Sequence, residues 1–103
     1  MECVYYVETL YCEERYAVVR VANYFIANIY LPCSGSTDGL FICEEILANV
    51  SALYDRYRAC ECLIAGDFNV NLDSSDPVAV CINKFLLDFP YIVAMTFFLY
   101  KSL

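Results

Sequence analysis

Apolar runs separated by short polar breaks divide this chain into segments of strand and helix length. Runs rich in valine, tyrosine and isoleucine are typical of strands. They predict strands at 3–8, 16–21, 24–31 and 61–66. The polar break Glu13-Glu14-Arg15 predicts a hairpin turn, and Pro32 ends the third strand because proline cannot donate to a sheet. That third run is apolar at nearly every position, which is typical of a strand covered on both faces.

An amphipathic helix is predicted at 40–58, because apolar residues recur there at steps of three and four. The stripe comprises Cys43, Ile46, Leu47, Val50, Leu53, Tyr54 and Tyr57. Ser36, Thr37 and Asp38 precede it and are candidates for its N-cap.

Pro77 is well placed in the first turn of a second helix running to about Asp88. We expect Val80, Phe85 and Leu86 on its inner face. The resulting order of three strands, helix, strand and helix predicts an α/β fold.

Composition changes this picture, because 61% of only 103 residues are hydrophobic. So short a chain forms one domain at most and has little interior in which to bury them. We therefore expect self-association, or a partner that covers an exposed sheet.

Seven cysteines and no histidine are present. Most of these cysteines lie in apolar runs, where a free thiol behaves as a small hydrophobe, so reduced core cysteines are favoured over a disulfide framework. Zinc is disfavoured because the usual ligand spacings are missing.

The net charge of −7 disfavours unaided binding of nucleic acid, which requires cations against its phosphates. The longest uncharged apolar stretch, 89–100, is shorter than the ~20 residues of a membrane span, so no membrane association is expected. The start lacks the basic region of a signal peptide, which favours an intracellular protein in the cytoplasm or nucleus.

The segment with the most chemistry is Gly66-Asp67-Phe68-Asn69, directly after an apolar strand. Alternation places Asp67 and Asn69 on one side of an extended chain. A carboxylate beside an amide suits a Mg²⁺-bound phosphate. On spacing alone a simple turn is the favoured interpretation, since glycine, aspartate and asparagine are preferred turn residues.

The same segment resembles the GDFN motif of the endonuclease/exonuclease/phosphatase superfamily, which is deoxyribonuclease I-like and includes the endonuclease domains of non-LTR retrotransposons. Asn28-Ile29-Tyr30-Leu31-Pro32 resembles the family's tyrosine-proline strand end, and one long helix separates the two motifs as in the family. The resemblance covers about residues 4–88. It implies a partial α+β sandwich over 1–88, about half of the two-sheet fold, followed by a divergent apolar tail at 89–103.

Carried over residue by residue, the resemblance implies three catalytic residues. Asp67 matches the aspartate that orients the attacking water, and Asn69 matches the asparagine that contacts the scissile phosphate. Tyr30 matches the tyrosine that stabilises developing charge. The implied cofactor is Mg²⁺, with its protein ligands unknown, and the implied substrate is nucleic acid.

The family pattern also includes a metal-binding glutamate strand and a Ser-Asp-His motif, which we do not find in this sequence. We therefore expect a truncated domain without autonomous activity and with weak or absent nucleic-acid binding. Two alternatives are a Mg²⁺-dependent phosphodiester hydrolase completed by other segments, and a non-catalytic interaction module using an apolar sheet face.

Overall fold

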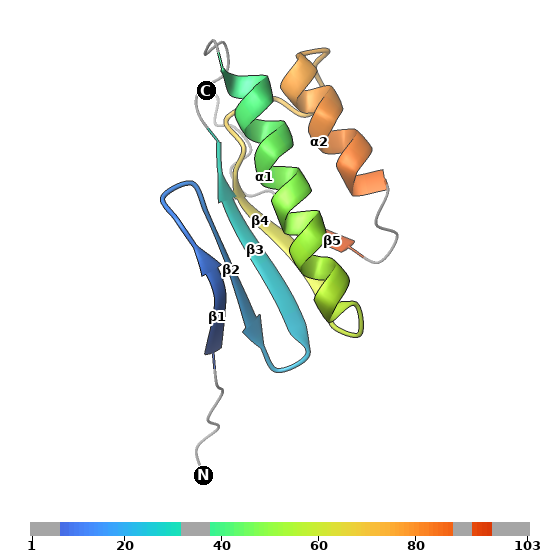
Figure 1. Ribbon diagram of the computed structural model, residues 1–103. Coiled ribbons are helices and arrows are strands. Elements are labelled where there is room, and N and C mark those ends of the chain that lie inside the picture. Colours follow the sequence, from blue (N-terminus) through green and yellow to red (C-terminus); the bar gives the residue numbers. More distant parts are fainter. Residues whose placement is uncertain (1–6, 32–37, 88–91, 96–103) are drawn as a thin grey trace.

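The computed structural model describes residues 7–31, 38–87 and 92–95. Its elements combine one sheet with two α-helices, which confirms the predicted α/β class (Figure 1). In chain order they are β1 (Val7–Cys12), β2 (Tyr16–Val21), β3 (Tyr24–Tyr30), α1 (Gly39–Tyr54), the short 3-10 helix η1 (Asp55–Tyr57), β4 (Glu61–Asp67), α2 (Pro77–Leu87) and β5 (Ile92–Met95). The strands lie side by side in that same order, with the short β5 beside β4.

Strands β1, β2 and β3 form an antiparallel meander. The predicted hairpin turn is confirmed, because the Glu13 amide donates to the Tyr16 carbonyl at 2.9 Å across it. The first strand differs from its predicted position at 3–8. It continues to Cys12, since the chain stays paired with β2 until this turn, and residues 3–6 lie outside the described residues.

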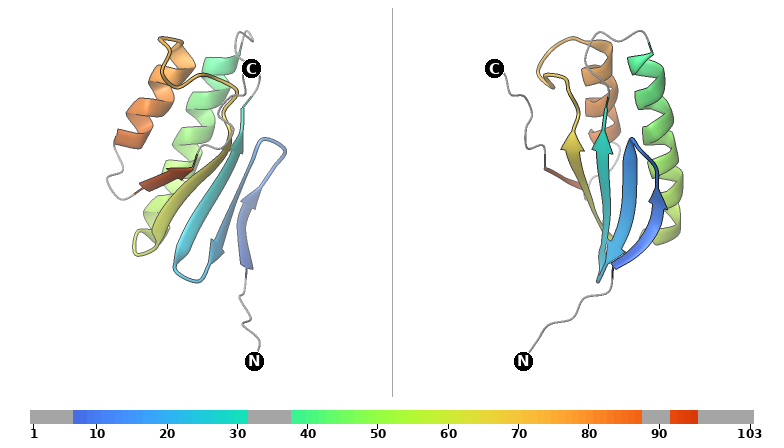
Figure 2. Two further views of the ribbon diagram at one scale, coloured as in Figure 1. Left: turned by 180° about the vertical axis from the view of Figure 1, so that it is seen from behind. Right: turned by 90° about the vertical axis from the view of Figure 1, so that its left-hand side faces the viewer.

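The other half of the sheet is parallel, with β3 beside β4 and β4 beside β5. Helix α1 connects the first pair and α2 lies between the strands of the second. Both crossovers step across the sheet in the same direction, so crossovers of one hand bring both helices to the same face. Figure 2 shows this arrangement, with a single helix layer against the sheet.

The core lies between that helix layer and the inner face of the sheet. Strands alternate between buried and accessible positions, as the pleat requires. The buried side chains from the strands are Tyr16, Val18, Phe25, Ala27, Ile29, Cys62 and Ile64, and those from the helices are Cys43, Ile46, Leu47, Val50, Tyr54, Ala79 and Ile82.

The prediction that β3 is covered on both faces is wrong for the described residues. Its inner side chains are buried, whereas Tyr24 and Tyr30 on the outer face are 42% and 55% exposed. The reason is that both described helices lie on the inner side. The outer face still carries apolar side chains at its centre, where Ile26 is in register with Val19 and Leu63.

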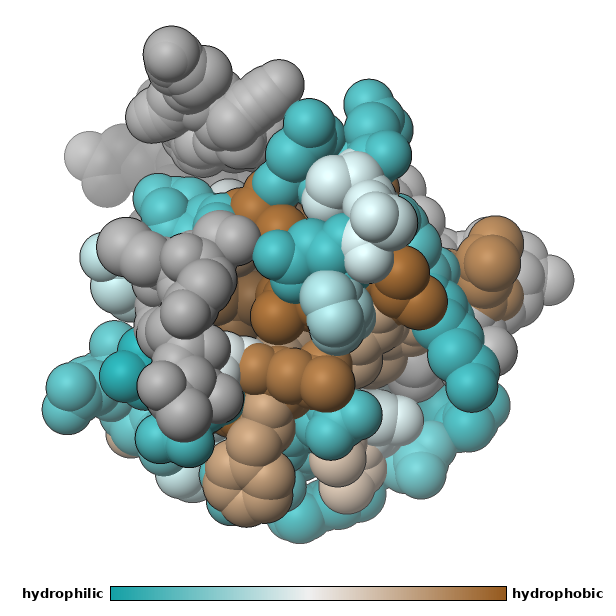
Figure 3. Space-filling model, turned by 90° about the horizontal axis from the view of Figure 1, so that it is seen from above, coloured by the Kyte–Doolittle hydropathy of each residue, from teal (hydrophilic) through white to brown (hydrophobic). Residues whose placement is uncertain are grey.

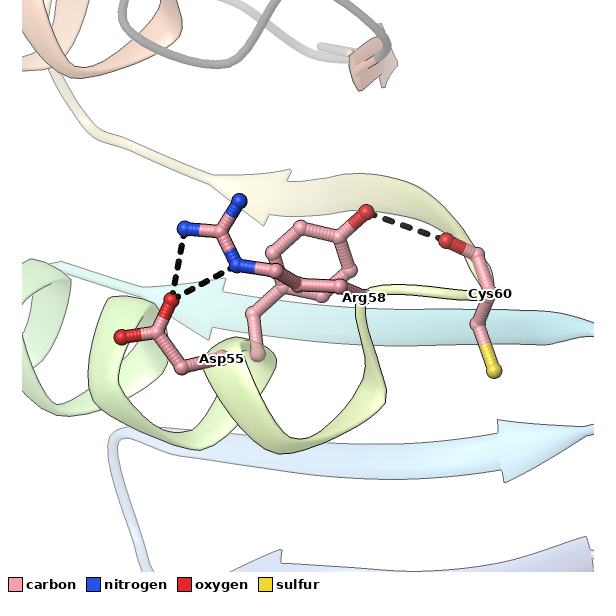
Figure 4. Close-up of polar contacts among 4 residues, drawn as sticks. Asp55, Arg58 and Cys60 are labelled. Atoms are coloured by element: carbon pink, nitrogen blue, oxygen red, sulfur yellow. Dashed lines mark hydrogen bonds and ion pairs between the residues drawn. The ribbon is translucent and has the colours of Figure 1, made fainter.

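The apolar stripe of α1 is confirmed, with Leu53 and Tyr57 partly buried at its end. The α-helix itself stops at Tyr54, four residues before the predicted end at Arg58, and continues as η1. Figure 4 shows the polar contacts that close this end. The Tyr54 hydroxyl donates to the carbonyl oxygen of Cys60 at 3.0 Å, and Arg58 pairs with Asp55 at 2.8 Å.

At the N-terminus of α1, Asp38 occupies the N-cap position without a side-chain capping bond. Ser36 and Thr37 lie outside the described residues. Helix α2 begins at Pro77 as predicted, but Val80 is not on its inner face, since it is 55% exposed. The fully buried positions are Ala79 and Ile82, one helical step apart, and the predicted Phe85 and Leu86 are partly buried against the same core.

Part of the apolar tail forms β5, which pairs with β4 in parallel register, and the remaining tail lies outside the described residues. The five described cysteines are free thiols. Within the described ranges, neither helix is of a length and hydropathy that could cross a bilayer.

The two most buried thiols predict a pH dependence of stability. Burial raises the pKa of Cys62 from its ordinary value of 9 to about 12, and burial, with a contribution from Cys81, raises that of Cys43 similarly. The folded state thus keeps protons that the unfolded chain releases, so this stability is present below pH 9 and is lost as the pH rises towards 12. Each pH unit in that window is expected to lower the unfolding free energy by about 1.4 kcal/mol per thiol.

Urea unfolding on either side of that window measures this loss for wild type and for Cys62→Ala. The variant should show the shallower decline, whereas Cys12→Ala, which removes an exposed thiol, should decline as wild type does. Identical slopes for all three proteins would contradict the assignment.

Candidate functional site

The predicted site residues lie at the carboxyl edge of the parallel pair β3 and β4. The register of this pair makes Tyr30 and Asp67 direct neighbours on adjacent strands. One bond continues the ladder beyond them, from the Leu31 amide to the Asp67 carbonyl at 3.0 Å. Ligand sites in open α/β sheets commonly lie outside the carboxyl ends of parallel strands, and this edge has that position.

Gly66 allows β3 and β4 to approach each other directly before the site. Its φ of +134° is a backbone conformation that side chains strongly disfavour. A Cβ atom at this position would overlap the carbonyl group of Ile29 on the neighbouring strand. The glycine of the motif therefore sets the level of Asp67 beside Tyr30.

Asn69 connects the turn after β4 to the end of β3. Its backbone amide donates to Asp67 Oδ1 at 3.0 Å, and its side-chain Nδ2 donates to the Leu31 carbonyl at 2.7 Å. Its φ of 51° lies in the left-handed region, which asparagine tolerates better than most residues. Between Asp67 and Asn69, the side chain of Phe68 is 3% exposed and anchors the turn in the core.

These contacts bring the three sequence-predicted residues together. Asp67 is held by Asn69, and both are attached to the strand that carries Tyr30. The Tyr30 side chain is 55% exposed, while Asp67 and Asn69 are half-buried, so a solute can approach this edge. The turn interpretation and the site interpretation of 66–69 are therefore compatible, because the turn orients the side chains of Asp67 and Asn69.

Arg15 is a further residue at this edge that the sequence analysis did not single out. Its carbonyl oxygen accepts the Tyr30 amide at 2.7 Å, which places the β1–β2 turn next to the end of β3. The arginine is half-buried. The sequence contained a signal for this position. Because β2 and β3 are antiparallel, the turn before β2 lies at the edge of the sheet where β3 ends. That turn contains Arg15, the first basic residue of the chain.

The donor set of this edge consists of a carboxylate, an amide oxygen and a phenol. No cluster of three or more cysteine, aspartate or glutamate side chains able to hold a metal occurs among the described residues. The oxygens of Asp67 and Asn69 suit a hard cation that keeps several waters and binds through a substrate phosphate. The residues present thus fit Mg²⁺ as one part of its coordination and not as a complete protein cage.

A cavity with a volume of about 690 Å³ lies elsewhere, in the groove between α1 and α2. The edge at Tyr30 and Asp67 is an open surface site by comparison. It presents a hydroxyl donor beside a carboxylate that one hydrogen bond holds in place.

Comparison of the chain with protein-family models, with curated proteins and with solved structures gave no match.

Two backbone positions give opposite predictions for substitution. Gly66→Ala should destabilise the fold by about 3 kcal/mol or more, because strand backbone must move to admit a methyl group. Ala22 has a φ of 54° in the two-residue turn between β2 and β3, so Ala22→Gly should stabilise by about 0.5–1 kcal/mol. Urea unfolding of the two variants against wild type measures both changes, and equal effects at the two positions would refute this account of the β3–β4 approach.

Substitutions at Asn69 separate its two roles. Asn69→Gly tolerates the positive φ and loses only the bond to the Leu31 carbonyl, so we expect a loss of about 1 kcal/mol. Asn69→Ala loses the bond and adds left-handed strain, for a total of about 2–3 kcal/mol. The measurement is again the urea midpoint, and an alanine variant as stable as the glycine variant would show that backbone strain is not part of the role.

Proposed function

We propose that this chain carries part of a Mg²⁺-dependent phosphodiester-cleaving centre of the endonuclease/exonuclease/phosphatase type, and that it does not turn over substrate by itself. The observation that supports this most is the direct register of Tyr30 with Asp67, with Asn69 bonded to both strand ends. The family-like motif at 66–69 follows β4, and the motif that contains Tyr30 lies at the end of β3. The two motifs thereby meet at one edge of the sheet. The proposal includes a retrotransposon endonuclease ancestry, for which the support is the resemblance of the motifs.

Each side chain has a role that its position allows. The Tyr30 hydroxyl projects from an exposed residue and donates to a phosphate oxygen, where it stabilises charge that develops during cleavage. The Asp67 carboxylate has one oxygen fixed by the Asn69 amide, so its other oxygen is oriented towards an attacking water. Asn69 holds this geometry and presents its amide oxygen at the same edge.

Bound Mg²⁺ would neutralise phosphate charge and lower the pKa of a coordinated water. Asp67 is the residue of this edge that would contribute a carboxylate to it. Arg15, next to Tyr30, adds a cation on the opposite side of the tyrosine from Asp67. A phosphodiester bound at Tyr30, between Arg15 and Asp67, would have the arginine cation on one side and the water-orienting carboxylate on the other.

The layering supports the view that the chain is one part of a larger sandwich. The described helices lie on one face of the sheet, while the other face has Val19, Ile26 and Leu63 in a row across three strands. An apolar sheet face of this kind is ordinarily covered by a second layer. A two-sheet, deoxyribonuclease I-like sandwich would supply that layer, together with the groups that complete the metal site.

Binding of a phosphodiester tests the positioning role separately from turnover. We expect a thymidine dinucleotide with Mg²⁺ to shift the amide resonances of Tyr30, Asp67 and Asn69 in the isotope-labelled chain. Tyr30→Phe removes only the hydroxyl and should weaken this binding about tenfold. Tyr24→Phe is the matched control at the opposite end of β3 and should bind as wild type does. Absence of any shift at this edge would overturn the proposed site.

Turnover distinguishes the proposed role from a complete enzyme. Hydrolysis of bis(p-nitrophenyl) phosphate with Mg²⁺ should be the same for wild type and Asp67→Ala, at the background rate. Hydrolysis that depends on Asp67 would show instead that the chain is a working phosphodiesterase.

A further inference from the structure

The outer surface of the helix layer contains a groove that the phosphodiesterase proposal does not use. It lies between α1 and α2 and has a volume of about 690 Å³. Its lining includes Leu40, Glu44, Leu47, Val80, Lys84 and Phe85, and these residues are called the α1–α2 groove below. Figure 3 looks down on the end of the molecule where both helices begin and shows apolar surface open between polar side chains.

The helix layer exposes hydrocarbon that the described parts of the chain leave uncovered. Leu40 and Phe41 of α1 are 37% and 66% exposed, and Val80 and Leu87 of α2 are 55% and 83% exposed. In β1 and β3, three of the four large exposed apolar residues are tyrosines, whose hydroxyls remain solvated. The helix residues have no such polar tip, and two of them, Leu40 and Val80, line the groove, so their exposure marks an interaction surface.

The charges of the two helices are of opposite sign. Helix α1 contains two glutamates and no basic residue, whereas α2 contains one lysine and no acidic residue. The ion pairs among the described residues are Arg20–Glu8 and Arg58–Asp55, and neither involves Glu44 or Lys84. The groove therefore has an acidic wall and a basic wall.

Such a surface is complementary to itself. A two-fold axis along the groove exchanges its walls, so α1 of one copy faces α2 of the other and Glu44 faces Lys84 twice. Closed two-fold interfaces require this property, since the same patch serves on both sides. A ligand with a single sign of charge would be attracted by one wall and repelled by the other.

We propose that the α1–α2 groove is the docking surface for a second copy of this chain, with the exposed Leu40 and Val80 side chains buried between the copies. The overall charge of −7 opposes contact between copies in general. Lys84 makes this face an exception, because in the two-fold arrangement it supplies a cation opposite the second copy's glutamate. The groove is distinct from the edge at Asp67, so self-docking and the phosphodiester site are tested independently of each other.

Charge reversal tests this docking by sedimentation equilibrium at low ionic strength. Wild type should be a dimer, and Glu44→Lys or Lys84→Glu should each raise the dimer dissociation constant by about tenfold or more, because each places like charges together. The double variant Glu44→Lys with Lys84→Glu should recover the wild-type constant. Recovery is specific for self-docking, because an unrelated partner would bind the double variant worse than either single one.

Glu45→Lys provides the matched control, since it makes the same charge change on the same helix at an exposed position outside the groove lining. It should dimerise as wild type does, and circular dichroism should show all variants folded. A monomeric wild type would overturn the proposal. Single reversals without effect, or a folded double variant that stays monomeric, would overturn it as well.

Discussion

The close approach of β3 and β4 at Gly66 is the constraint on which the rest of this structure depends. Any side chain at that position would overlap the Ile29 carbonyl, so only glycine permits the register observed. That register aligns Phe25 with Cys62 and Ala27 with Ile64 on the inner face, which is where the core forms. The same register sets Tyr30 beside Asp67 at the other end. Core and candidate site are thus two consequences of one steric condition.

The one-sided helix layer explains the distribution of apolar residues. Helices from both crossovers pack on the inner face, and the core between them and the sheet contains no buried polar or charged side chain among the described residues. Among the described residues, further hydrophobic side chains lie on the outer sheet face and on the outer helix surface. A high apolar content in a short chain is therefore a property of its surfaces as well as of its core.

These two surfaces differ chemically, and the difference suggests different uses. The outer sheet face is a row of small and branched side chains bordered by tyrosines, and the proposed catalytic edge forms one of its borders. The helix surface combines larger exposed hydrocarbon with opposite charges on its two walls. A layer completing a sandwich and a second copy of the chain could occupy both surfaces at once, because the surfaces lie on opposite sides of the molecule.

The sequence by itself determined the type and order of the elements from β1 to α2, though not all of their bounds, because alternation in strands and three- and four-residue steps in helices are local patterns. It placed β2 at 16–21, the apolar stripe of α1, and the start of α2 at Pro77 correctly. It also singled out Asp67 and Asn69 as the polar pair that follows the apolar strand β4. Only the tertiary structure decided which face of β3 is covered, that Val80 is exposed, and that Tyr30 lies between Arg15 and Asp67. The reason is that burial and strand register depend on which segments pack together in space. Here Gly66 decides the packing of β3 against β4, because a side chain at that position would overlap the Ile29 carbonyl.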